Sequence, residues 1–318
     1  MMLQILLLLV GLALVVFGAD YLVDGASAIA RRVGLSEFVI GLTIVGMGTS
    51  APEMVVSFIG AFQGNADISV GNVVGSNIFN ALLILGITGI LLPMAITPEN
   101  RKQDIPINIL VTIALILLGF KHTIFGIGTD GLDRIDGAIL LLMFIAYMWR
   151  SFATGKGAEE VADDAKPLKL GWAIVMIVGG IAALIFGGKL FVNSATHIAL
   201  SAGISDKFIA ITLLAGGTSM PELATCIAAA VKKKGQLALG NIIGSNLFNI
   251  LLILGGSALI HPLSFAGISF VDMGVLLVSA LVLWTSCLVG KKNTLDRLDG
   301  VLMVLIWVAY MAYLVVNL

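Results

Sequence analysis

The sequence is poor in charge. Only 12% of its 318 residues are Asp, Glu, Lys or Arg, whereas a typical soluble domain carries about 25%. Hydrophobic residues make up 59% of the chain, in repeated runs close to the roughly 20 residues that a membrane-spanning helix needs. The alternating apolar and polar pattern of a transmembrane β-barrel is absent. The composition therefore predicts an all-α membrane protein that crosses the bilayer several times.

Cysteine, histidine and net charge are also low, which excludes several functions. Cys226 and Cys287 lie in apolar segments outside any CxxC pattern, and the three histidines stand singly near predicted helix ends. Such scattered residues predict packing roles rather than a transition-metal site. The net charge of −1 gives no reason to expect a nucleic-acid partner. No HExxH motif or Ser/His arrangement is present, so we expect no enzyme activity and no cofactor.

The chain contains an internal duplication, the most informative feature of the sequence. A shift of 169 residues aligns "GTSAPE" (48–53) with "GTSMPE" (217–222), and it aligns "GNVVGSNIFNALLILG" (71–86) with "GNIIGSNLFNILLILG" (240–255). Over residues 41–86 this shift gives 19 identities in 46 positions. The words "LDRIDG" (132–137) and "LDRLDG" (295–300) match at a shift of 163. One loop is therefore six residues shorter in the second copy.

Each copy contains five apolar segments. In the first copy, residues 1–150, they lie near 3–23, 37–62, 69–93, 105–120 and 133–150. In the second copy, residues 170–318, they lie near 170–192, 206–231, 238–260, 270–289 and 296–316. The charged stretch 151–169 between the copies is typical of a flexible linker. The first segment lacks the basic flank of a signal peptide, so we interpret it as a mature helix.

An odd number of spans per copy inverts the second copy in the membrane, an arrangement common among secondary transporters. With ten spans, 14 of the 18 Lys and Arg residues fall on one side of the bilayer. The positive-inside rule makes that side cytoplasmic, which assigns the linker 151–169 to the cytoplasm. We therefore expect a multi-pass protein of the cell membrane, plasma or inner, surrounded by lipid and with both termini outside.

Glu53 and Glu222 lie near the middle of the second and seventh predicted spans. An ionised side chain at that depth costs a few kcal/mol or more, and it persists where it faces a cavity or a partner. No Lys or Arg is expected at a similar depth to pair with either glutamate. The missing counter-charge is then most economically a cation from solution, or a proton.

Oxygen-bearing residues and a helix breaker surround each glutamate. Thr49 and Ser50 share a helix face with Glu53. Pro52 removes one backbone hydrogen bond and, with two preceding glycines, should open the helix. Carbonyls freed at this depth are tolerated where they line a cavity or are buried in protein. The second copy repeats the arrangement in "GGTSMPE" (216–222).

The next span of each copy adds more oxygen. Asparagine and serine recur there in an i, i+4, i+8 stripe, as Asn72, Ser76 and Asn80 in the first copy and as Asn241, Ser245 and Asn249 in the second. Carboxylates, amide and main-chain carbonyls and hydroxyls are hard ligands, suited to Ca²⁺ or Na⁺ rather than to Zn²⁺ or Cu²⁺. The sequence thus predicts one cation site built from both copies.

Packing is the competing explanation for several of these features. The G-x-x-x-G patterns at 71–75 and 240–244 are typical of close helix contacts, and we assign those glycines to packing. Asp20 and Asp24 end the first predicted span, where we expect them to be solvated. The lysine run 232–234 indicates topology rather than a binding patch.

The paired words "GTSAPE" with "GNVVGSNIFN", and "GGTSMPE" with "GNIIGSNLFN", resemble the α-repeats of the calcium/cation antiporter superfamily. The resemblance spans essentially the whole chain, which is close in size to the compact prokaryotic Na⁺/Ca²⁺ exchangers. It implies ten transmembrane helices in two inverted five-helix repeats, with broken helices carrying the ion site. It also implies exchange of Na⁺ for Ca²⁺ by alternating access, in which the first and sixth spans slide over a core of four helices.

The resemblance implies a set of ligands as well. Glu53 and Glu222 would coordinate Ca²⁺ together with the carbonyls of Thr49 and Thr218. The flanking Na⁺ sites and the centre of the site would use Ser50, Ser219, Ser76, Ser245, Gly46, Ala215, Asn80 and Asn249. In this resemblance, potassium-dependent relatives carry an aspartate at the position of Asn249. The asparagine here therefore implies K⁺-independent transport.

Other functions fit the sequence less well. A Ca²⁺/H⁺ or other cation/H⁺ antiporter is the alternative, because the same glutamates can bind protons. A cation channel lacks support, since the acidic pore ring expected of one is absent and inverted halves suit alternating access better. We expect Ca²⁺ and Na⁺ as transported ions rather than cofactors, and a monomer as the functional unit.

Overall fold

A computed structural model describes residues 2–64, 66–154, 168–201, 216–288 and 293–317. The elements of the first copy are, in order, α1 (Met2–Val33), α2 (Glu37–Ile40), η1 (Gly41–Val45), α3 (Gly46–Thr49), α4 (Ala51–Phe62), α5 (Ala66–Ile78), η2 (Phe79–Ile84), α6 (Leu85–Leu91), β1 (Met94–Ala95), η3 (Asn100–Asp104), α7 (Ile105–Gly119), α8 (Lys121–Phe125), β2 (Gly131–Leu132) and α9 (Arg134–Thr154). Those of the second copy are α10 (Leu170–Ser201), α12 (Met220–Val231), α13 (Gly235–Phe248), η5 (Asn249–Leu254), α14 (Gly255–Ile260), β3 (Leu263–Ser264), α15 (Phe270–Ser286), β4 (Thr294–Leu295) and α16 (Arg297–Val316). The η elements are π-helical turns within longer helices.

Eight candidate membrane spans are present among the described residues. Seven are single long apolar helices, and the eighth is a helix pair, Glu37–Thr49 with Ala51–Phe62, bent by 50°. Two shorter apolar helices, α12 and α15, lie at the positions of the seventh and ninth predicted spans. The predicted helical membrane architecture is therefore confirmed, while the count of ten spans and the inversion of the copies remain predictions. Among the described residues, β-strands occur only in two short two-stranded sheets, which are described below.

The outer spans differ in length from those predicted. The first helix runs to Val33 instead of ending near residue 23, and α10 runs to Ser201 instead of ending near residue 192. Small residues and single polar side chains do not stop either helix, because the two helices pack together along their length. The helix α9 also continues to Thr154, four residues into the predicted linker; residues 155–167 of that linker lie outside the described part of the chain.

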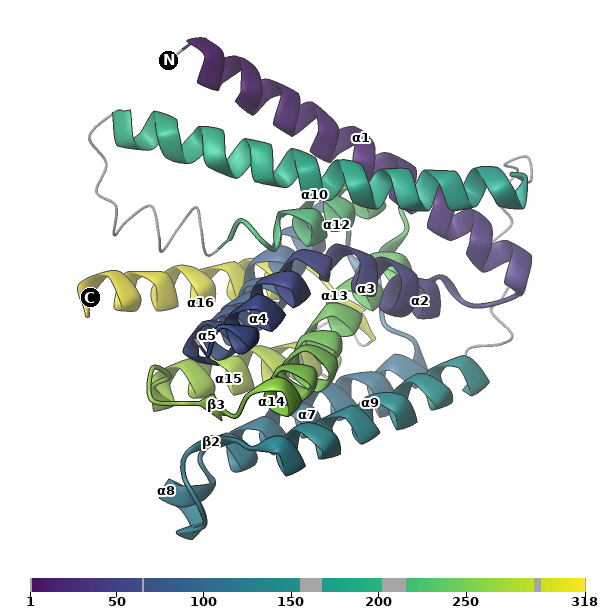
Figure 1. The fold of residues 1–318 in the computed structure, drawn as a ribbon. Helices are drawn as coiled ribbons and strands as arrows, with labels where there is room; N and C mark the ends of the chain where they lie inside the picture. Colours follow the sequence, from purple (N-terminus) through teal and green to yellow (C-terminus); the bar gives the residue numbers. More distant parts are fainter. Residues whose placement is uncertain (1, 65, 155–167, 202–215, 289–292, 318) are drawn as a thin grey trace.

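The helices α1 and α10 form a separate layer across one side of the molecule (Figure 1). Their backbones approach closely at small residues: a Cβ added to Gly11 would lie 2.9 Å from the carbonyl oxygen of Gly187, and one added to Gly180 would lie 2.7 Å from that of Gly18. Small residues of this kind allow tight contact between membrane helices. Gly11 and Gly180, like Gly18 and Gly187, are equivalent positions of the duplication, so each helix presents the same glycines to the other.

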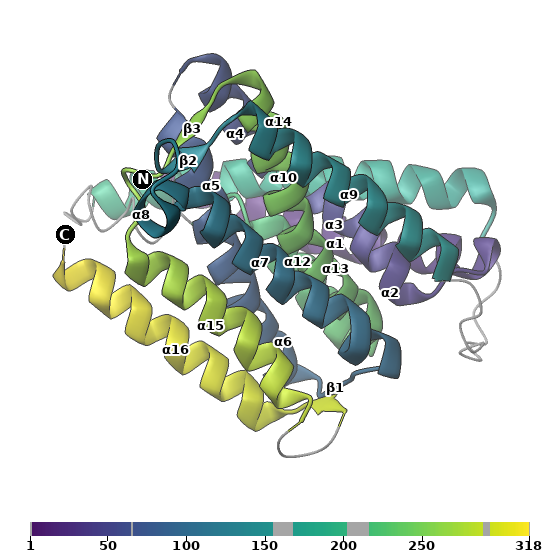
Figure 2. The ribbon, with the colours of Figure 1, turned by 90° about the horizontal axis from the view of Figure 1, so that it is seen from below.

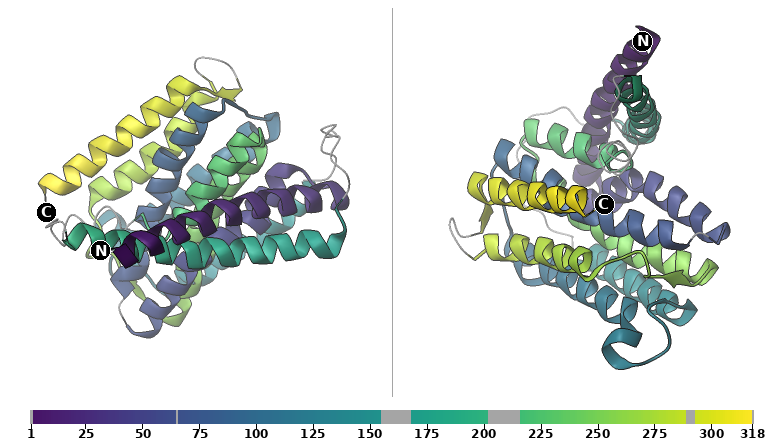
Figure 3. Two further views of the ribbon diagram at one scale, coloured as in Figure 1. Left: turned by 90° about the horizontal axis from the view of Figure 1, so that it is seen from above. Right: turned by 90° about the vertical axis from the view of Figure 1, so that its left-hand side faces the viewer.

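The centre of the molecule is formed by the helices that carry the repeated motifs. In the most apolar 18-residue stretch of the helix Gly235–Ile260, 94% is buried inside the molecule. The buried share of the same length of Arg297–Val316 is only 11%. The views from below and from two further sides show α13 enclosed by neighbours while α16 lies at the periphery (Figures 2 and 3). Buried glycines make this enclosure possible, since a Cβ on Gly240 would lie 2.2 Å from the carbonyl of Phe38 and one on Gly244 would lie 2.3 Å from that of Leu42.

The packing role assigned to G-x-x-x-G is therefore confirmed for the second copy. In the first copy, a Cβ on Gly71 or Gly75 would meet no atom of the described residues within 4 Å. The positions equivalent to Phe38 and Leu42 are residues 207 and 211, which lie outside the described part of the chain.

Short strands join the two copies at their loops. The strand β1 pairs antiparallel with β4, and β2 pairs antiparallel with β3. In the duplication, β1 corresponds to β3 and β2 corresponds to β4. Exchanging the copies thus converts one strand pair into the other, which indicates that the two copies have equivalent environments at their loops.

Asp20 and Asp24 are exposed, as expected, and they also form ion pairs. Both lie within α1 rather than at its end, and the Lys232 ammonium lies 2.6 Å from an Asp20 oxygen and 2.7 Å from an Asp24 oxygen. Lys234 forms a further ion pair with Glu37 at 2.8 Å. Both aspartate side chains are also exposed, at 52% for Asp20 and 42% for Asp24, as a solvated position requires. The ion pairs form because the lysines that follow α12 lie beside α1 and the start of α2. These contacts join the two copies on the side where α12 ends.

Candidate cation site

In the first copy the helix is broken at Ser50, between α3 and α4, and in the second copy Ser219 directly precedes α12 with nearly the same backbone angles. Ser50 has φ −79° and ψ 7°, and Ser219 has φ −89° and ψ 8°. Each serine precedes a new helix whose first turn contains Pro52 or Pro221. Proline is tolerated there because the first turn of a helix does not need its N–H. The predicted opening of the helix is therefore present in the first copy, where the two parts are bent by 50°. In the second copy the residues before 216 lie outside the described part of the chain.

The serine of each motif contacts the glutamate of the other. Ser50 Oγ donates to Glu222 Oε1 at 2.9 Å, and Ser219 Oγ donates to Glu53 Oε1 at 3.1 Å. These residues are 172 and 166 positions apart in the sequence. The duplication thus produces a reciprocal pair of hydrogen bonds in the middle of the molecule.

Glu53 and Glu222 are fully buried, with no exposed surface. Their Oε2 atoms have no hydrogen-bond partner among the described residues. Within the same part of the chain, neither carboxylate forms an ion pair; the ion pairs there involve Asp20, Asp24, Glu37, Asp133 and Asp136 as acids. A buried carboxylate without a counter-charge is costly, so each glutamate offers one free oxygen to a cation.

Asparagines from the following helices lie beside the glutamates. Asn80 Nδ2 donates to Asn246 Oδ1 at 3.2 Å, and Asn249 Nδ2 donates to Asn77 Oδ1 at 2.9 Å. These bonds fix the amide planes so that Asn80 Oδ1 and Asn249 Oδ1 remain buried without a partner among the described residues. Each amide oxygen is therefore available as a neutral ligand. Both asparagines belong to π-helical turns, η2 and η5, a local geometry frequent at functional sites.

Sequence reasoning missed Asn77 and Asn246. They fall outside the i, i+4, i+8 stripe because each directly follows a serine of the stripe, one position around the helix. Their signal was the duplication itself, which repeats the asparagine at a shift of 169. In the structure Asn77 also donates to the carbonyl oxygen of Asn246 at 3.1 Å, so this pair holds the two π-helical turns together.

Asn72 and Asn241 serve a different purpose from the other members of the stripe. Asn72 Nδ2 donates to the Glu53 carbonyl at 3.3 Å and to Ser57 Oγ at 3.2 Å. Asn241 Nδ2 donates to Cys226 Sγ at 3.3 Å, and Cys226 is the duplication partner of Ser57. Both asparagines thus connect neighbouring helices. Cys226 is buried and acts in this packing, as expected.

The remaining predicted ligands are arranged unequally. Ser245 Oγ and Thr49 Oγ1 each lie 3.4 Å from the Gly46 carbonyl, which also accepts from the Ser50 N–H. Thr49 Oγ1 further donates to Asn241 Oδ1 at 3.2 Å. Ser76 Oγ is buried and has no partner among the described residues. The expected carbonyl ligand Ala215 lies outside the described part of the chain.

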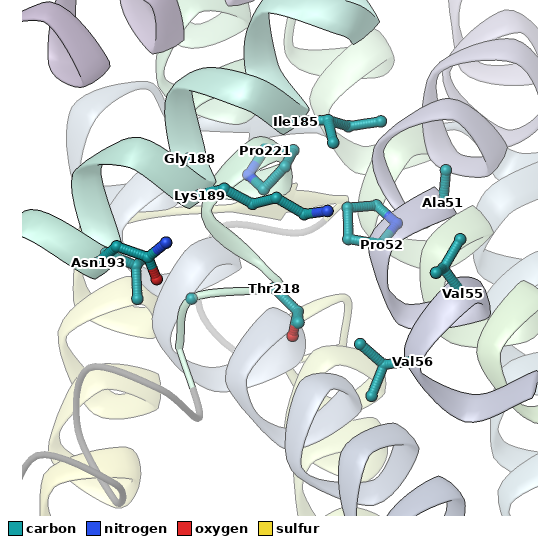
Figure 4. A pocket seen from close by; sticks show the side chains of 12 residues that line it. Ala51, Pro52, Val55, Val56, Ile185, Gly188, Lys189, Asn193, Thr218 and Pro221 are labelled. Carbon is teal, nitrogen blue, oxygen red and sulfur yellow. The ribbon is translucent and has the colours of Figure 1, made fainter. Parts of the chain in front are cut away.

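A pocket of about 250 Å³ lies next to the second-copy motif. It opens between α10, α4 and the start of α12 (Figure 4). Its lining includes Pro52, Thr218 and Pro221, residues that directly flank the break in each helix. The rest of the lining consists of Ala51, Val55, Val56, Ile185, Gly188, Lys189, Val192, Asn193 and Gly217. The pocket thus reaches the prolines that directly precede the two buried glutamates, while the glutamates are not among its described lining residues.

A family model described as "Sodium/calcium exchanger protein" matches residues 3–153 and 172–316, a range that includes both motifs and nearly all of the described helices. The chain belongs to this exchanger family. Its expected membership of the calcium/cation antiporters is thereby confirmed, and the family is one of cation/Ca²⁺ antiporters rather than enzymes.

Individual relatives agree with this assignment over almost their full length. This exchanger is 39% identical over 320 residues to the "Putative antiporter CaxA" of Alkalimonas amylolytica, covering 98% of each chain. It is 34% identical to the "Sodium/calcium exchanger MaX1" of Methanosarcina acetivorans, covering 97% of each. A solved structure of the sodium-calcium exchanger NCX_Mj, soaked with Na⁺ and Sr²⁺, matches with a TM-score of 0.83 and 33% identity over 98% of each chain.

Proposed function

We propose that this protein exchanges Na⁺ for Ca²⁺ by alternating access, independently of K⁺. The observation that carries this proposal is the pair of fully buried glutamates, each with one carboxylate oxygen held by a serine of the other copy and one oxygen free. Two carboxylates balance the charge of one Ca²⁺, and hard oxygen ligands of this kind suit Ca²⁺ and Na⁺. The names of the relatives MaX1 and NCX_Mj support Na⁺ and Ca²⁺ as cargo.

The proposed ligands divide into two groups. Ca²⁺ is held by the carboxylates of Glu53 and Glu222 and by the carbonyls of Thr49 and Thr218. Na⁺ occupies flanking positions formed by Ser50, Ser219, Ser76, Ser245, Gly46 and Ala215, with Asn80 and Asn249 between them. Removing either kind of cargo leaves two buried charges that repel each other, so the empty site resists closure on both sides. Exchange is then obligatory.

The layer formed by α1 and α10 is the proposed moving part. It covers the motif helices from one side and packs against α2, η1, α3 and α12. Lys232 adds ion pairs to Asp20 and Asp24 of α1, and the pocket lies beside α10. Sliding of this layer would close the pocket and break the ion pairs, exposing the site to the opposite side. We place both termini outside the cell, so that the pocket faces outward and the ion pairs face the cytoplasm.

The test is uptake of ⁴⁵Ca²⁺ into proteoliposomes containing the purified protein. Vesicles loaded with Na⁺ and diluted into Na⁺-free buffer should accumulate Ca²⁺, and collapsing the Na⁺ gradient should stop it. Adding K⁺ on either side, with the membrane potential clamped, should change nothing because position 249 is asparagine. Uptake that follows an imposed pH gradient and ignores Na⁺ would instead establish the alternative, a Ca²⁺/H⁺ antiporter.

A further inference from the structure

Lys189 is the only charged residue among the described lining residues of the pocket. Its side chain extends across the opening towards Pro52, and Pro221 lies beside it (Figure 4). Each of these prolines is followed directly in the sequence by one of the buried glutamates. A positive charge therefore stands in an apolar opening that leads towards an acidic cation site, which the proposed transport of cations does not explain.

The duplication sharpens this contrast. A shift of 169 residues aligns Lys189 with Asp20 and aligns Asn193 with Asp24. The same shift aligns Lys232 with Gln63. At the α1 end two aspartates pair with a lysine, whereas at the α10 end a lysine and an asparagine replace the aspartates. Within the described part of the chain, Lys189 has no ion-pair partner. The net charge is thus negative where Asp20 and Asp24 meet Lys232 on α1, and positive at Lys189 on α10.

We propose that Lys189 is a specificity-determining residue for ion entry through this pocket, one that disfavours Ca²⁺ relative to Na⁺. Coulomb repulsion is proportional to the charge of the ion, so a fixed ammonium opposes a divalent cation twice as strongly as a monovalent one. The same repulsion slows Ca²⁺ entry and speeds its release into the pocket. On the α10 side, release of Ca²⁺ from the site into the pocket is then faster, and its rebinding from the pocket is slower. The comparison with Na⁺ rests on the proposed function, which names Na⁺ as the second transported ion.

The experiment compares right-side-out and everted membrane vesicles that contain the full-length protein. Half-saturating Ca²⁺ for ⁴⁵Ca²⁺ uptake, and half-saturating Na⁺ for its inhibition, are measured for the wild type, Lys189→Gln, Lys189→Glu and Lys189→Arg. With Lys189→Gln we expect the half-saturating Ca²⁺ to fall by about two- to fivefold on one side of the membrane only. Half-saturating Na⁺ should fall less than half-saturating Ca²⁺. Lys189→Glu should lower both values further, and Lys189→Arg should leave both at their wild-type values.

Two controls separate an electrostatic role from a structural one. Lys169→Gln removes the same charge just before the start of α10, at an exposed position, and should not change either value. Raising the ionic strength with choline chloride should remove the difference between wild type and Lys189→Gln, because charges separated by more than about 10 Å are screened at 0.1 M salt. In the wild type alone, added choline chloride should lower half-saturating Ca²⁺ on the pocket side.

Several results would overturn the inference. The first is a half-saturating Ca²⁺ that is unchanged in Lys189→Gln, or shifts that are equal for Ca²⁺ and Na⁺ or equal on the two sides of the membrane. The second is a Lys189→Arg variant that behaves like Lys189→Gln. The third is a half-saturating Ca²⁺ of the wild type that does not change with ionic strength. If Ca²⁺ uptake follows a pH gradient, the Na⁺/Ca²⁺ assignment fails. The Ca²⁺ titration still tests Lys189 in that case, so the two failures are distinguishable.

Discussion

The two copies of the duplication share their motifs but differ in their surroundings. At the centre they are equivalent, since Ser50 holds Glu222 and Ser219 holds Glu53. At the edges they differ, since Lys232 joins α12 to α1 by two ion pairs while the corresponding end of α10 borders a pocket. The centre is therefore symmetric while the edges are unequal. The proposed alternating access needs this combination, because the site would bind the same ions from both sides while only one side is open at a time.

The largest effect should come from the glutamates, and it should be the same for both copies. Glu53→Gln and Glu222→Gln each remove half of the charge that balances a divalent ion, so each should reduce Na⁺-dependent ⁴⁵Ca²⁺ exchange to background. Glu99→Gln, a change at an exposed carboxylate, is the matched control and should retain exchange. Full exchange in either site variant, with normal gel-filtration behaviour, would contradict the equivalence of the copies and the assignment of the site.

The reciprocal serines should produce a smaller, equally matched effect. Ser50→Ala and Ser219→Ala each remove one hydrogen bond to a buried carboxylate, an interaction of about 1.5–3 kcal/mol. We expect half-saturating Ca²⁺ to rise about tenfold or more in each, and the two values to agree within about twofold. A large effect of one serine and none of the other would show that the central symmetry has no energetic counterpart. Ser257→Ala, a buried serine outside the motifs, is the control.

The ion pairs at Lys232 should have a modest effect that appears on one side only. Partly exposed pairs contribute about 0.2–1 kcal/mol, so Lys232→Gln should shift the ratio of half-saturating Ca²⁺ on the two sides by at most about fivefold. Asp20→Asn combined with Asp24→Asn should reproduce this shift. Adding Lys232→Gln to that double variant should cause no further change, since interacting residues are not additive. Independent, additive shifts in vesicle assays would mean that these residues do not act as one contact.

The smallest effect concerns stability at the loops. Asp133 and Asp296 are equivalent positions, and each caps the following helix through the same backbone hydrogen bonds. Asp133 additionally accepts from Lys121 at 2.5 Å, and that hydrogen bond holds the pKa of Asp133 below its ordinary value. Asp133→Asn should therefore cost a few tenths of a kcal/mol more than Asp296→Asn, measured by thermal unfolding in detergent.

The pH dependence of that excess has a definite sign. A carboxyl whose pKa is lowered in the folded state adds stability above the unfolded value, about 3.9, and loses it as the pH falls through the folded value. The excess cost of Asp133→Asn should be constant between about pH 5 and pH 9, should begin to fall near about pH 4, and should disappear only below the lowered pKa of folded Asp133. An excess that persists at low pH would assign it to packing rather than to the ion pair with Lys121.

Much of the centre could be predicted from residues alone. The helix break at Ser50 followed from Pro52, and the gathering of Glu53 and Glu222 followed from the repeated motif in apolar surroundings. Asn77 and Asn246 were missed because they lie one residue after the serines of the stripe, and their pairing depends on contact between the two copies. The ion pairs of Asp20 and Asp24 were not foreseen, because their partner, Lys232, is more than 200 residues away and its proximity depends on how α1 lies against α12.

The sequence by itself determined the membrane architecture, the duplication and the identity of the oxygen-rich motifs. It did so because apolar length, periodicity and self-similarity are properties of a chain that do not depend on which parts touch. Only the tertiary structure decided that each serine serves the opposite glutamate, and that the pocket lies beside Lys189 of α10 while the Lys232 ion pairs lie on α1. Those facts depend on packing between distant helices, and two nearly identical motifs cannot encode in their own residues which of them lies beside the opening.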